Sequence, residues 1–321
     1  MTGKLPRPRL PARPNAGHKG DFGRVAVVGG CALAHTRMLG APALAAHAAT
    51  RSGAGLVQLV CPEGVLNEAL GISAHATGRS LPTDARGALL ASEAVAVLDT
   101  VLEEADALVI GPGLGRGSGP AALALRAIQQ KAMPVVIDAD AINELAQTPQ
   151  LALDFHAPAV VTPHPGEFAR LADALGMDAN ATDDTRRPAA AEALAQRLGC
   201  VVVLKGARTV VSDGIQTWSD ETADSALATG GTGDVLAGLL GGLIAQHARP
   251  VMHELARAKL GERVKHMGDD GKLTLFEIAR CAVVAHAHAA RLWRESHHAD
   301  AGLTPMELAE ALPEAVTALR G

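Results

Sequence analysis

The stretch Ala228-Thr229-Gly230-Gly231-Thr232-Gly233-Asp234 leads directly into an apolar helical pattern over residues 235–245. Glycines let the backbone approach a bound group closely, and the free N–H groups at a helix start favour an anion there. A carboxylate repels a phosphate already bound at such a turn, but Asp234 could take the proton from a hydroxyl that attacks the phosphate. The pattern therefore predicts phosphoryl transfer to an alcohol, with Asp234 as an ordinary N-cap being the structural alternative.

The composition describes a large α/β protein without a nucleic-acid partner. The chain has 321 residues, 48% of them hydrophobic, a net charge of −5 and only 2% aromatic residues. A nucleic-acid partner would require a basic face or aromatic platforms for its bases. The four scattered cysteines predict buried free thiols in a reducing compartment. Because no apolar run reaches the ~18 residues of a membrane span, we expect a cytoplasmic enzyme with no membrane contact.

The organisation of the chain predicts one domain behind a short arm. Residues 1–17 are rich in proline and arginine and have no apolar signal-peptide core, so we expect a flexible or surface-draped arm. No internal repeat or low-complexity linker divides residues 18–321. The charged segment 251–272 predicts a solvated helical excursion, after which an apolar helix over 273–293 rejoins the core.

Five short runs rich in valine and isoleucine predict buried strands of a parallel sheet. Helical patterns over 39–52 and 120–131 lie between them, so the alternation predicts a doubly wound α/β sheet with helices on both faces. Each run is followed by polar or glycine-rich residues, and ligands bind at the carboxyl ends of parallel strands. We therefore expect one long cleft at that edge. The runs are residues 24–28, 107–110, 135–137, 160–162 and 201–204.

An ordered set of motifs resembles the ADP/ATP-dependent NAD(P)H-hydrate dehydratases, a branch of the ribokinase-like fold. Together the motifs extend over residues 18–320 in the family's order. They are Lys19-Gly20-Asp21-Phe22-Gly23-Arg24, Arg51-Ser52-Gly53-Ala54-Gly55-Leu56-Val57, Ile110-Gly111-Pro112-Gly113-Leu114-Gly115, Asp138-Ala139-Asp140-Ala141-Ile142-Asn143, Thr162-Pro163-His164-Pro165-Gly166-Glu167, Leu204-Lys205-Gly206-Ala207 and the turn 228–234.

The resemblance implies a carbon–oxygen lyase that repairs hydrated NADH or NADPH (NADHX or NADPHX). ADP or ATP would phosphorylate the ring hydroxyl, phosphate would leave, and the reduced dinucleotide would be restored, with Mg²⁺ as a cofactor. Bacterial members typically use ADP and release AMP. The resemblance also implies a homo-oligomer, a tetramer in related proteins. Because the arm before Lys19 is short, we expect a stand-alone dehydratase without the epimerase domain that many bacterial members carry.

By resemblance, Asp234 is the catalytic base. The anion hole is Gly231, Thr232 and Gly233, and the nucleotide-binding loop is Lys205, Gly206, Ala207, Arg208 and Thr209. A surface hairpin over 210–214 is the structural alternative for that loop. The hydrated dinucleotide would contact Ala41, Gly113, Gly115, His164 and Asp234. The alternatives are core packing for Ala41, a plain turn for the glycines, and helix capping for His164.

The metal ligands are less defined by the sequence. Glu167 and Asp138 are candidates for Mg²⁺, but Glu167 also suits capping of a helix over 168–175, and Asp140 suits N-capping before Asn143. The other histidines match no common zinc spacing and predict core or helix-surface positions. They include His286, His288, His297 and His298.

Two other functions remain open. A small-alcohol kinase of the same fold, acting on hydroxyethylthiazole, hydroxymethylpyrimidine or a sugar, would share the glycine-rich turn. A non-catalytic nucleotide-binding module is the third interpretation, although Asp234 and Lys205 argue against it. The family usually has an Asn-Pro-Gly-like approach where this chain has Ala223-Asp224-Ser225-Ala226-Leu227, so the nucleotide pocket is expected to differ in shape.

Overall fold

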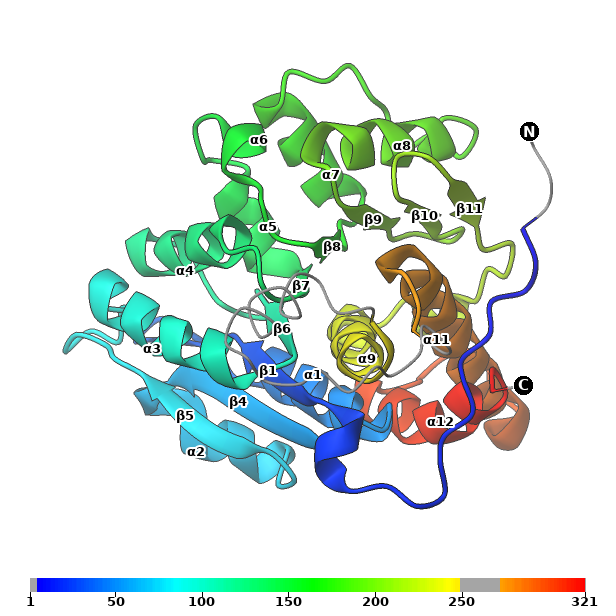
Figure 1. The fold of residues 1–321 in the computed structure, drawn as a ribbon, viewed down its shortest axis with the longest axis horizontal. Helices are drawn as coiled ribbons and strands as arrows, with labels where there is room; N and C mark the ends of the chain where they lie inside the picture. Colours follow the sequence, from blue (N-terminus) through cyan, green and yellow to red (C-terminus); the bar gives the residue numbers. More distant parts are fainter. Residues whose placement is uncertain (1–4, 249–271, 321) are drawn as a thin grey trace, which may run out of the picture.

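The computed structural model describes residues 5–248 and 272–320, and its centre is a nine-stranded sheet (Figure 1). The predicted excursion over 251–272 lies outside the described residues, except for Lys272. From one edge to the other the strands are β11 (Thr217–Ser219), β10 (Val210–Ser212), β9 (Val201–Leu204), β8 (Ala159–Val161), β7 (Val135–Ile137), β6 (Ala107–Ile110), β1 (Arg24–Val28), β4 (Leu56–Pro62) and β5 (Thr77–Leu81).

The five expected strands are confirmed as the neighbouring strands β9, β8, β7, β6 and β1, which pair in parallel. Strands β4 and β5 extend the parallel sheet beyond β1, and β10 and β11 add an antiparallel edge beyond β9. The sequence offered a surface hairpin over 210–214 as the structural alternative to a nucleotide-binding loop, and a hairpin of β10 and β11 is present there. It begins after the proposed nucleotide loop, and β10 is buried.

Helices cover both faces of the sheet because successive side chains of each strand point to opposite cores. Along β1, Val25 and Val27 pack into one core, whereas Ala26 and Val28 pack into the other. The first core contains α1 (Gly40–Arg51), α2 (Glu63–Ile72), α9 (Thr232–His247), α11 (Leu275–His297) and α12 (Pro305–Thr317). The second contains α3 (Ala91–Glu104), α4 (Ser118–Gln129), α5 (Ala139–Leu145), α6 (Leu151–Asp154), α7 (Pro165–Ala174) and α8 (Arg187–Leu198).

Helix α9 is a central helix that packs closely against α1 (Figure 1). A Cβ at Gly238 would lie 2.0 Å from the carbonyl oxygen of Ala45, so only glycine permits this approach. The contact fixes the axis of α9 relative to α1 and the sheet. It therefore also fixes the position of the glycine-rich turn at the start of α9.

The strand order reverses at β1. The chain passes from β1 to β4 and β5 on one side and then returns to place β6, β7, β8 and β9 on the other side. Ligands of open α/β sheets bind beyond the carboxyl ends of the strands at such a switch point. A small hairpin of β2 (Cys31–Leu33) and β3 (Thr36–Met38) follows β1 at this place.

Residues 5–17 lie against the C-terminal part of the chain. The backbone N–H of Leu10 donates to the carbonyl of Leu319 at 2.9 Å, and the side chain of Leu10 is buried. Arg13 donates to the carbonyl of Gly53 at 2.8 Å and to Oε1 of Gln246 at 2.9 Å, and Arg280 donates to the carbonyl of Pro6. Described residues of the arm are therefore fastened to α9, α11 and the segment after α12.

The expectation of free, buried cysteines is met within the described part of the chain. All four cysteines are free and buried. Among the described residues, no helix is both long enough and apolar enough to cross a membrane.

Candidate active site

The glycine-rich turn ends at the first residue of α9. Gly231 is the N-cap residue with φ of 95°, which favours glycine, and a Cβ there would lie 2.6 Å from Cγ of Pro305. The hydroxyl of Thr232 donates to the carbonyls of Leu227 and Thr229, each at 2.9 Å. These contacts hold the turn closed. The first amides of α9 thus open onto the carboxyl edge of the sheet, as an anion hole requires.

His286 supports this turn from α11. Its Nε2 lies 2.9 Å from the carbonyl oxygen of Thr232, and its side chain is buried. Burial lowers the pKa of His286 to about 4, so the ring is neutral at pH 7 and donates its proton to that carbonyl. The expectation of a core position is therefore confirmed. The sequence alone did not indicate that this histidine braces the anion hole.

Asp234 lies in the first turn of α9 and is half-buried. Its pKa is raised to about 7, mainly by burial and also by the nearby carboxylate of Asp138, whereas the Lys205 ammonium opposes the increase. A carboxyl group with a pKa near the working pH is well matched to general-base catalysis. Asp234 lies in the first turn of α9, where the sequence predicts a catalytic base.

Lys205, which directly follows β9, reaches into a cluster of carboxylates. Its Nζ lies 2.6 Å from Oδ1 of Asp138 and 3.9 Å from Oε2 of Glu167. A Cβ at Gly233 would be 3.6 Å from the same Nζ, so the ammonium also adjoins the start of α9. Burial works to lower the pKa of Lys205, but the surrounding carboxylates outweigh it and raise the pKa. Lys205 is therefore charged next to the anion hole.

Asp138 holds Lys205 in place. It is buried, and Oδ1 accepts a 2.6 Å hydrogen bond from the Thr162 hydroxyl as well as the 2.6 Å bond from Lys205. One interpretation of the sequence expected Asp140 to cap the N-terminus of α5, but the structure does not show this cap. The N-cap is Asp138, and Oδ2 of Asp140 accepts a 2.9 Å bond from the amide of Gly115. Asp140 thus ties α5 to the Gly113–Gly115 turn because the two loops end neighbouring strands.

His164 and Glu167 form a reciprocal cap at the start of α7. The amides of Gly166 and Glu167 donate to Nδ1 of His164 at 3.0 and 3.4 Å, and the amide of His164 donates to Oε2 of Glu167 at 2.8 Å. Both capping alternatives are therefore observed. Because Nδ1 accepts, the neutral ring carries its proton on Nε2. Burial and the charge of Lys205 lower the pKa of His164, which favours the neutral ring, and its Nε2 lies 3.4 Å from Oε1 of Glu167.

Glu167 is deeply buried, and this burial raises its pKa to about 7. The charge of Lys205 acts in the opposite direction, and the charge of Asp138 adds to the increase. Glu167 and Asp234 are thus two carboxyl groups that share one ammonium group and both titrate near neutrality. The charge of Glu167 raises the pKa of Asp234 through like-charge repulsion.

The predicted nucleotide loop, residues 205–209, is supported from below by Arg187 of α8. The Arg187 guanidinium is buried and donates to the carbonyls of Leu204 at 3.0 Å, Lys205 at 2.9 Å and Arg208 at 3.3 Å. Gly206, Ala207 and Arg208 themselves are exposed. The loop therefore presents an open backbone whose shape is set by one buried cation.

The Ala41 and Gly113 positions meet at the switch point. A Cβ at Gly113 would lie 3.3 Å from the Cβ of Ala41 and 3.0 Å from that of Met38. Leu44, one turn after Ala41, would lie 3.2 Å from a Cβ at Gly231. The start of α1 thus lies between the anion hole and the Gly113–Gly115 turn. The structure therefore brings the predicted site residues onto one edge.

The described residues do not fit a dedicated Mg²⁺ site. They include no group of three or more histidine, cysteine, aspartate or glutamate side chains placed to hold a metal ion. The two candidates, Asp138 and Glu167, both face the ammonium of Lys205 rather than a space between them. Mg²⁺ is commonly held by one or two carboxylates together with substrate phosphates. The protein residues alone therefore form no cation cage.

Three residues of the site carry no sequence signal of their role. Arg187, Thr162 and His286 act through contacts with residues distant in the sequence. In the sequence, Arg187 resembles an ordinary residue at a helix start, and His286 belongs to an apolar helix. Thr162 belongs to the Thr-Pro-His-Pro-Gly-Glu motif, but the motif does not indicate its contact with Asp138.

Comparisons with known proteins agree with this geometry. The family model described as NAD(P)H-hydrate dehydratase matches residues 25–314. A bifunctional NAD(P)H-hydrate repair enzyme from Moorella thermoacetica is 40% identical over 252 residues, which are 78% of this chain and 46% of the relative. This chain spans about half the length of the curated relatives first matched.

Solved structures have the same fold. The ADP/ATP-dependent NAD(P)H-hydrate dehydratase from Bacillus subtilis, co-crystallised with ATP and Mg²⁺, has a TM-score of 0.70 and 25% identity, with 97% of this chain and 95% of that chain covered. A ribokinase-like superfamily protein from Enterococcus faecalis has a TM-score of 0.72 and 24% identity, with 97% and 93% covered. The ribokinase-like fold is thereby confirmed, and the chain belongs to the NAD(P)H-hydrate dehydratase family.

Proposed function

We propose that the chain dehydrates hydrated NADH or NADPH at the expense of ADP or ATP. One observation carries the proposal: a carboxyl group with a raised pKa, Asp234, lies in the first turn of α9, beside an anion hole and the ammonium of Lys205. A base, a phosphate site and a counter-charge at one place are what phosphoryl transfer to a hydroxyl requires. Family membership selects the hydrated dinucleotide as the alcohol.

The nucleotide would lie along the loop 205–209, with its terminal phosphate at the start of α9. Lys205 and the amides of Gly231, Thr232 and Gly233 would stabilise the charge on the transferred phosphoryl group. The open backbone of the loop suits close approach by the rest of the nucleotide. Mg²⁺ would enter with the phosphates and neutralise part of their charge, since the described residues form no cage for it.

Asp234 would take the proton from the ring hydroxyl of the hydrated dinucleotide. The hydroxyl oxygen then bonds to the terminal phosphorus, and the bond from that phosphorus to the nucleotide's bridging oxygen breaks. AMP leaves when the donor is ADP, and ADP leaves when it is ATP. His164 would contact the substrate through its exposed ring, while its Nδ1 is occupied by the helix cap and its Nε2 lies 3.4 Å from Glu167.

Elimination would follow from the phosphoester. Its C–O bond breaks, inorganic phosphate departs with the bonding electrons, and a neighbouring ring carbon loses a proton, so that the ring double bond returns. Hydroxide is a poor leaving group, whereas phosphate is a good one. The nucleotide thus drives a dehydration that the hydrate undergoes slowly on its own.

Absorbance at 340 nm tests the proposal directly. Hydrated NADH is mixed with the protein, Mg²⁺ and either ADP or ATP, with a nucleotide-free control. A nucleotide-dependent rise in absorbance, matched by release of inorganic phosphate, is expected. No rise with either nucleotide, from folded protein, would contradict the proposal. A stable phosphorylated alcohol in an acceptor screen would then favour a small-alcohol kinase, and ADP binding without any turnover would favour a non-catalytic module.

We further propose a cytoplasmic homo-oligomer in which residues 18–321 form a single catalytic domain. The resemblance to the family supports both parts of this proposal. Light scattering at micromolar concentration tests the assembly, and the mass of a monomer would contradict it.

A further inference from the structure

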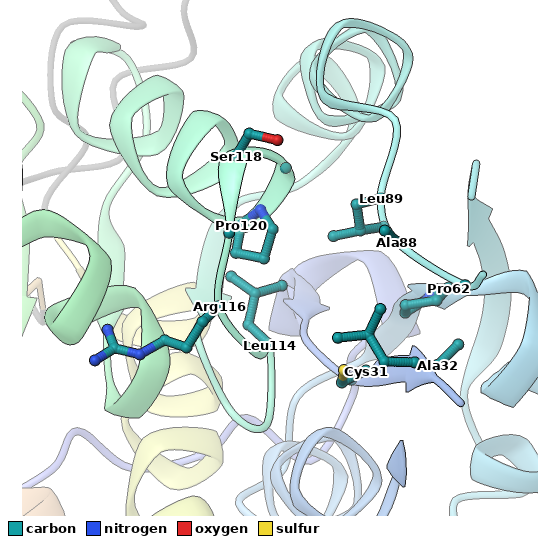
Figure 2. A pocket seen from close by; sticks show the side chains of 14 residues that line it. Cys31, Ala32, Pro62, Ala88, Leu89, Leu114, Arg116, Ser118 and Pro120 are labelled. Carbon is teal, nitrogen blue, oxygen red and sulfur yellow. The ribbon is translucent and has the colours of Figure 1, made fainter. Parts of the chain in front are cut away.

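A cavity opens at the switch point of the sheet, outside the cluster of Asp234, Lys205, Asp138 and Glu167. It has a volume of about 170 Å³ and lies where β1, β4 and β6 end. Apolar side chains form its wall, and in Figure 2 Leu114, Pro120 and Leu89 surround the space. We call it the switch-point cavity, defined by Leu33, Pro62, Leu89, Leu114 and Pro120 together with neighbouring small residues.

The switch-point cavity adjoins the proposed substrate path. A Cβ at Gly113 would touch the Cβ of Ala41 at 3.3 Å, and a Cβ at Gly115 would lie 3.0 Å from Sγ of Cys31, which lines the cavity. The turn that carries Gly113, Leu114 and Gly115 thus leads from the start of α1 into the cavity wall. A ligand lying along this turn can reach both places.

The chemistry of the cavity selects an uncharged ring. The side chain of Arg116 pairs with Glu144 at 3.3 Å and extends away from the space in Figure 2. Ligand pockets for whole small molecules measure roughly 300–1,000 Å³, so about 170 Å³ holds one ring system rather than a dinucleotide. The nicotinamide ring is not the ring that occupies this cavity, because its hydroxyl must meet Asp234, which does not line the cavity.

The adenine of the phosphate donor is excluded by distance. With its terminal phosphate at the start of α9, the rest of the donor would lie along the loop after β9, which is four strands from β1 in the sheet. At about 4.8 Å between strands, β9 and β1 are roughly 19 Å apart. A dinucleotide, by contrast, spans the crevice at a switch point, with its two halves on either side.

We propose that the switch-point cavity binds the adenine ring of the hydrated dinucleotide while the nicotinamide end lies at Asp234. This inference rests on the proposed function for the identity of the ligand. It adds a specificity site: the cavity distinguishes a dinucleotide from a mononucleotide, and it does so through packing rather than charge.

Equilibrium binding tests the inference without requiring turnover. Calorimetric titrations use NADH and reduced nicotinamide mononucleotide, with ADP kept saturating so that neither probe occupies the nucleotide loop. We expect NADH to bind wild type at least 10-fold more tightly than the mononucleotide. Ala88→Phe, which fills the cavity, should remove that advantage and leave the affinity for the mononucleotide unchanged. Ala85→Phe is the matched control, because Ala85 is exposed in the same loop.

Leu89→Ala provides a second variant if Ala88→Phe fails to fold. This substitution removes the Leu89 side chain from the cavity wall. It should weaken NADH binding 3- to 10-fold, on the scale of one lost apolar contact, and leave the affinity for the mononucleotide unchanged. Equal affinities of the two probes for wild type, or equal weakening of both by the variants, would overturn the inference. Failure of the proposed function has a different signature: wild type would bind NADH in the expected way but give no absorbance change with hydrated NADH and nucleotide.

Discussion

Replacement of Asp234 by asparagine should lower turnover by at least ~10²-fold and yet stabilise the protein above neutral pH. Burial raises the pKa of this carboxyl group from 3.8 to about 7. Because the folded pKa lies above the unfolded one, the carboxyl group favours folding fully below about pH 4. That contribution is lost as the pH rises through about 7. The ionised carboxylate thus costs stability in the working form of the enzyme.

The size of the effect follows from the pKa difference. About three pKa units at roughly 1.4 kcal/mol each set an upper limit of about 4 kcal/mol on the loss of unfolding free energy caused by the ionised carboxylate. Solvent screening at a half-buried group reduces this to roughly 2 kcal/mol. Asparagine has nearly the same shape and carries no charge. It should therefore recover about 2 kcal/mol of unfolding free energy at pH 8, roughly 1 kcal/mol at pH 5 and almost nothing below about pH 4.

Urea denaturation at pH 5 and pH 8 measures this difference. The comparison uses wild type, Asp234→Asn and the surface control Asp178→Asn, because Asp178 is exposed. In the 340 nm assay, Asp234→Asn should lose at least ~10²-fold in turnover, the scale of general-base removal. Equal stability differences at the two pH values would refute the desolvated charge. Turnover near that of wild type would refute the catalytic base.

Three further outcomes are expected. The rate should fall as the pH drops through about 7, because Asp234 must be ionised to act as a base. Glu167→Gln should move this acid limb of the pH–rate profile to lower pH, because it removes a like charge near Asp234. An unmoved limb would contradict the electrostatic coupling of the two carboxyl groups. Arg187→Lys should raise the KM for nucleotide about 10-fold or more, since lysine cannot span the three carbonyls of the loop, whereas the exposed control Arg186→Lys should not. Gly231→Ala should destabilise the protein by about 1–3 kcal/mol in thermal unfolding, more than Gly176→Ala, which shares a positive φ but has open space around it.

The sequence predicted the middle of the sheet well and its margins poorly. Strands β6, β7 and β9 are buried on both faces, so they stand out as continuous apolar runs. Strand β5, Thr-Gly-Arg-Ser-Leu, lies at the edge and buries only Leu81 fully. An edge strand has one pairing partner and exposed side chains, and its sequence therefore lacks the pattern on which the prediction depended.

The placement of the candidate residues was predictable where they lie in a contiguous motif. The turn 228–234 placed Asp234 at the start of α9, and the capping pair His164 and Glu167 was visible from their spacing of three residues. The charge balance was not predictable. Asp138 and Lys205 are 67 residues apart, and only the adjacency of the strand ends brings them to 2.6 Å. The two acidic residues that suggested a metal site, Asp138 and Glu167, both lie close to this lysine.

The hydrogen bond from Leu10 to Leu319 has a consequence for how the chain is made. Almost the entire printed sequence separates these two residues. Residue 319 is made long after residue 10, and contacts between such distant segments are slow to form. The hydrogen bond of Leu10 must consequently wait until residue 319 has been made, whereas the contact of Arg13 with Gly53 has both partners early in synthesis. A chain that ends before residue 319 would lack the partner of Leu10.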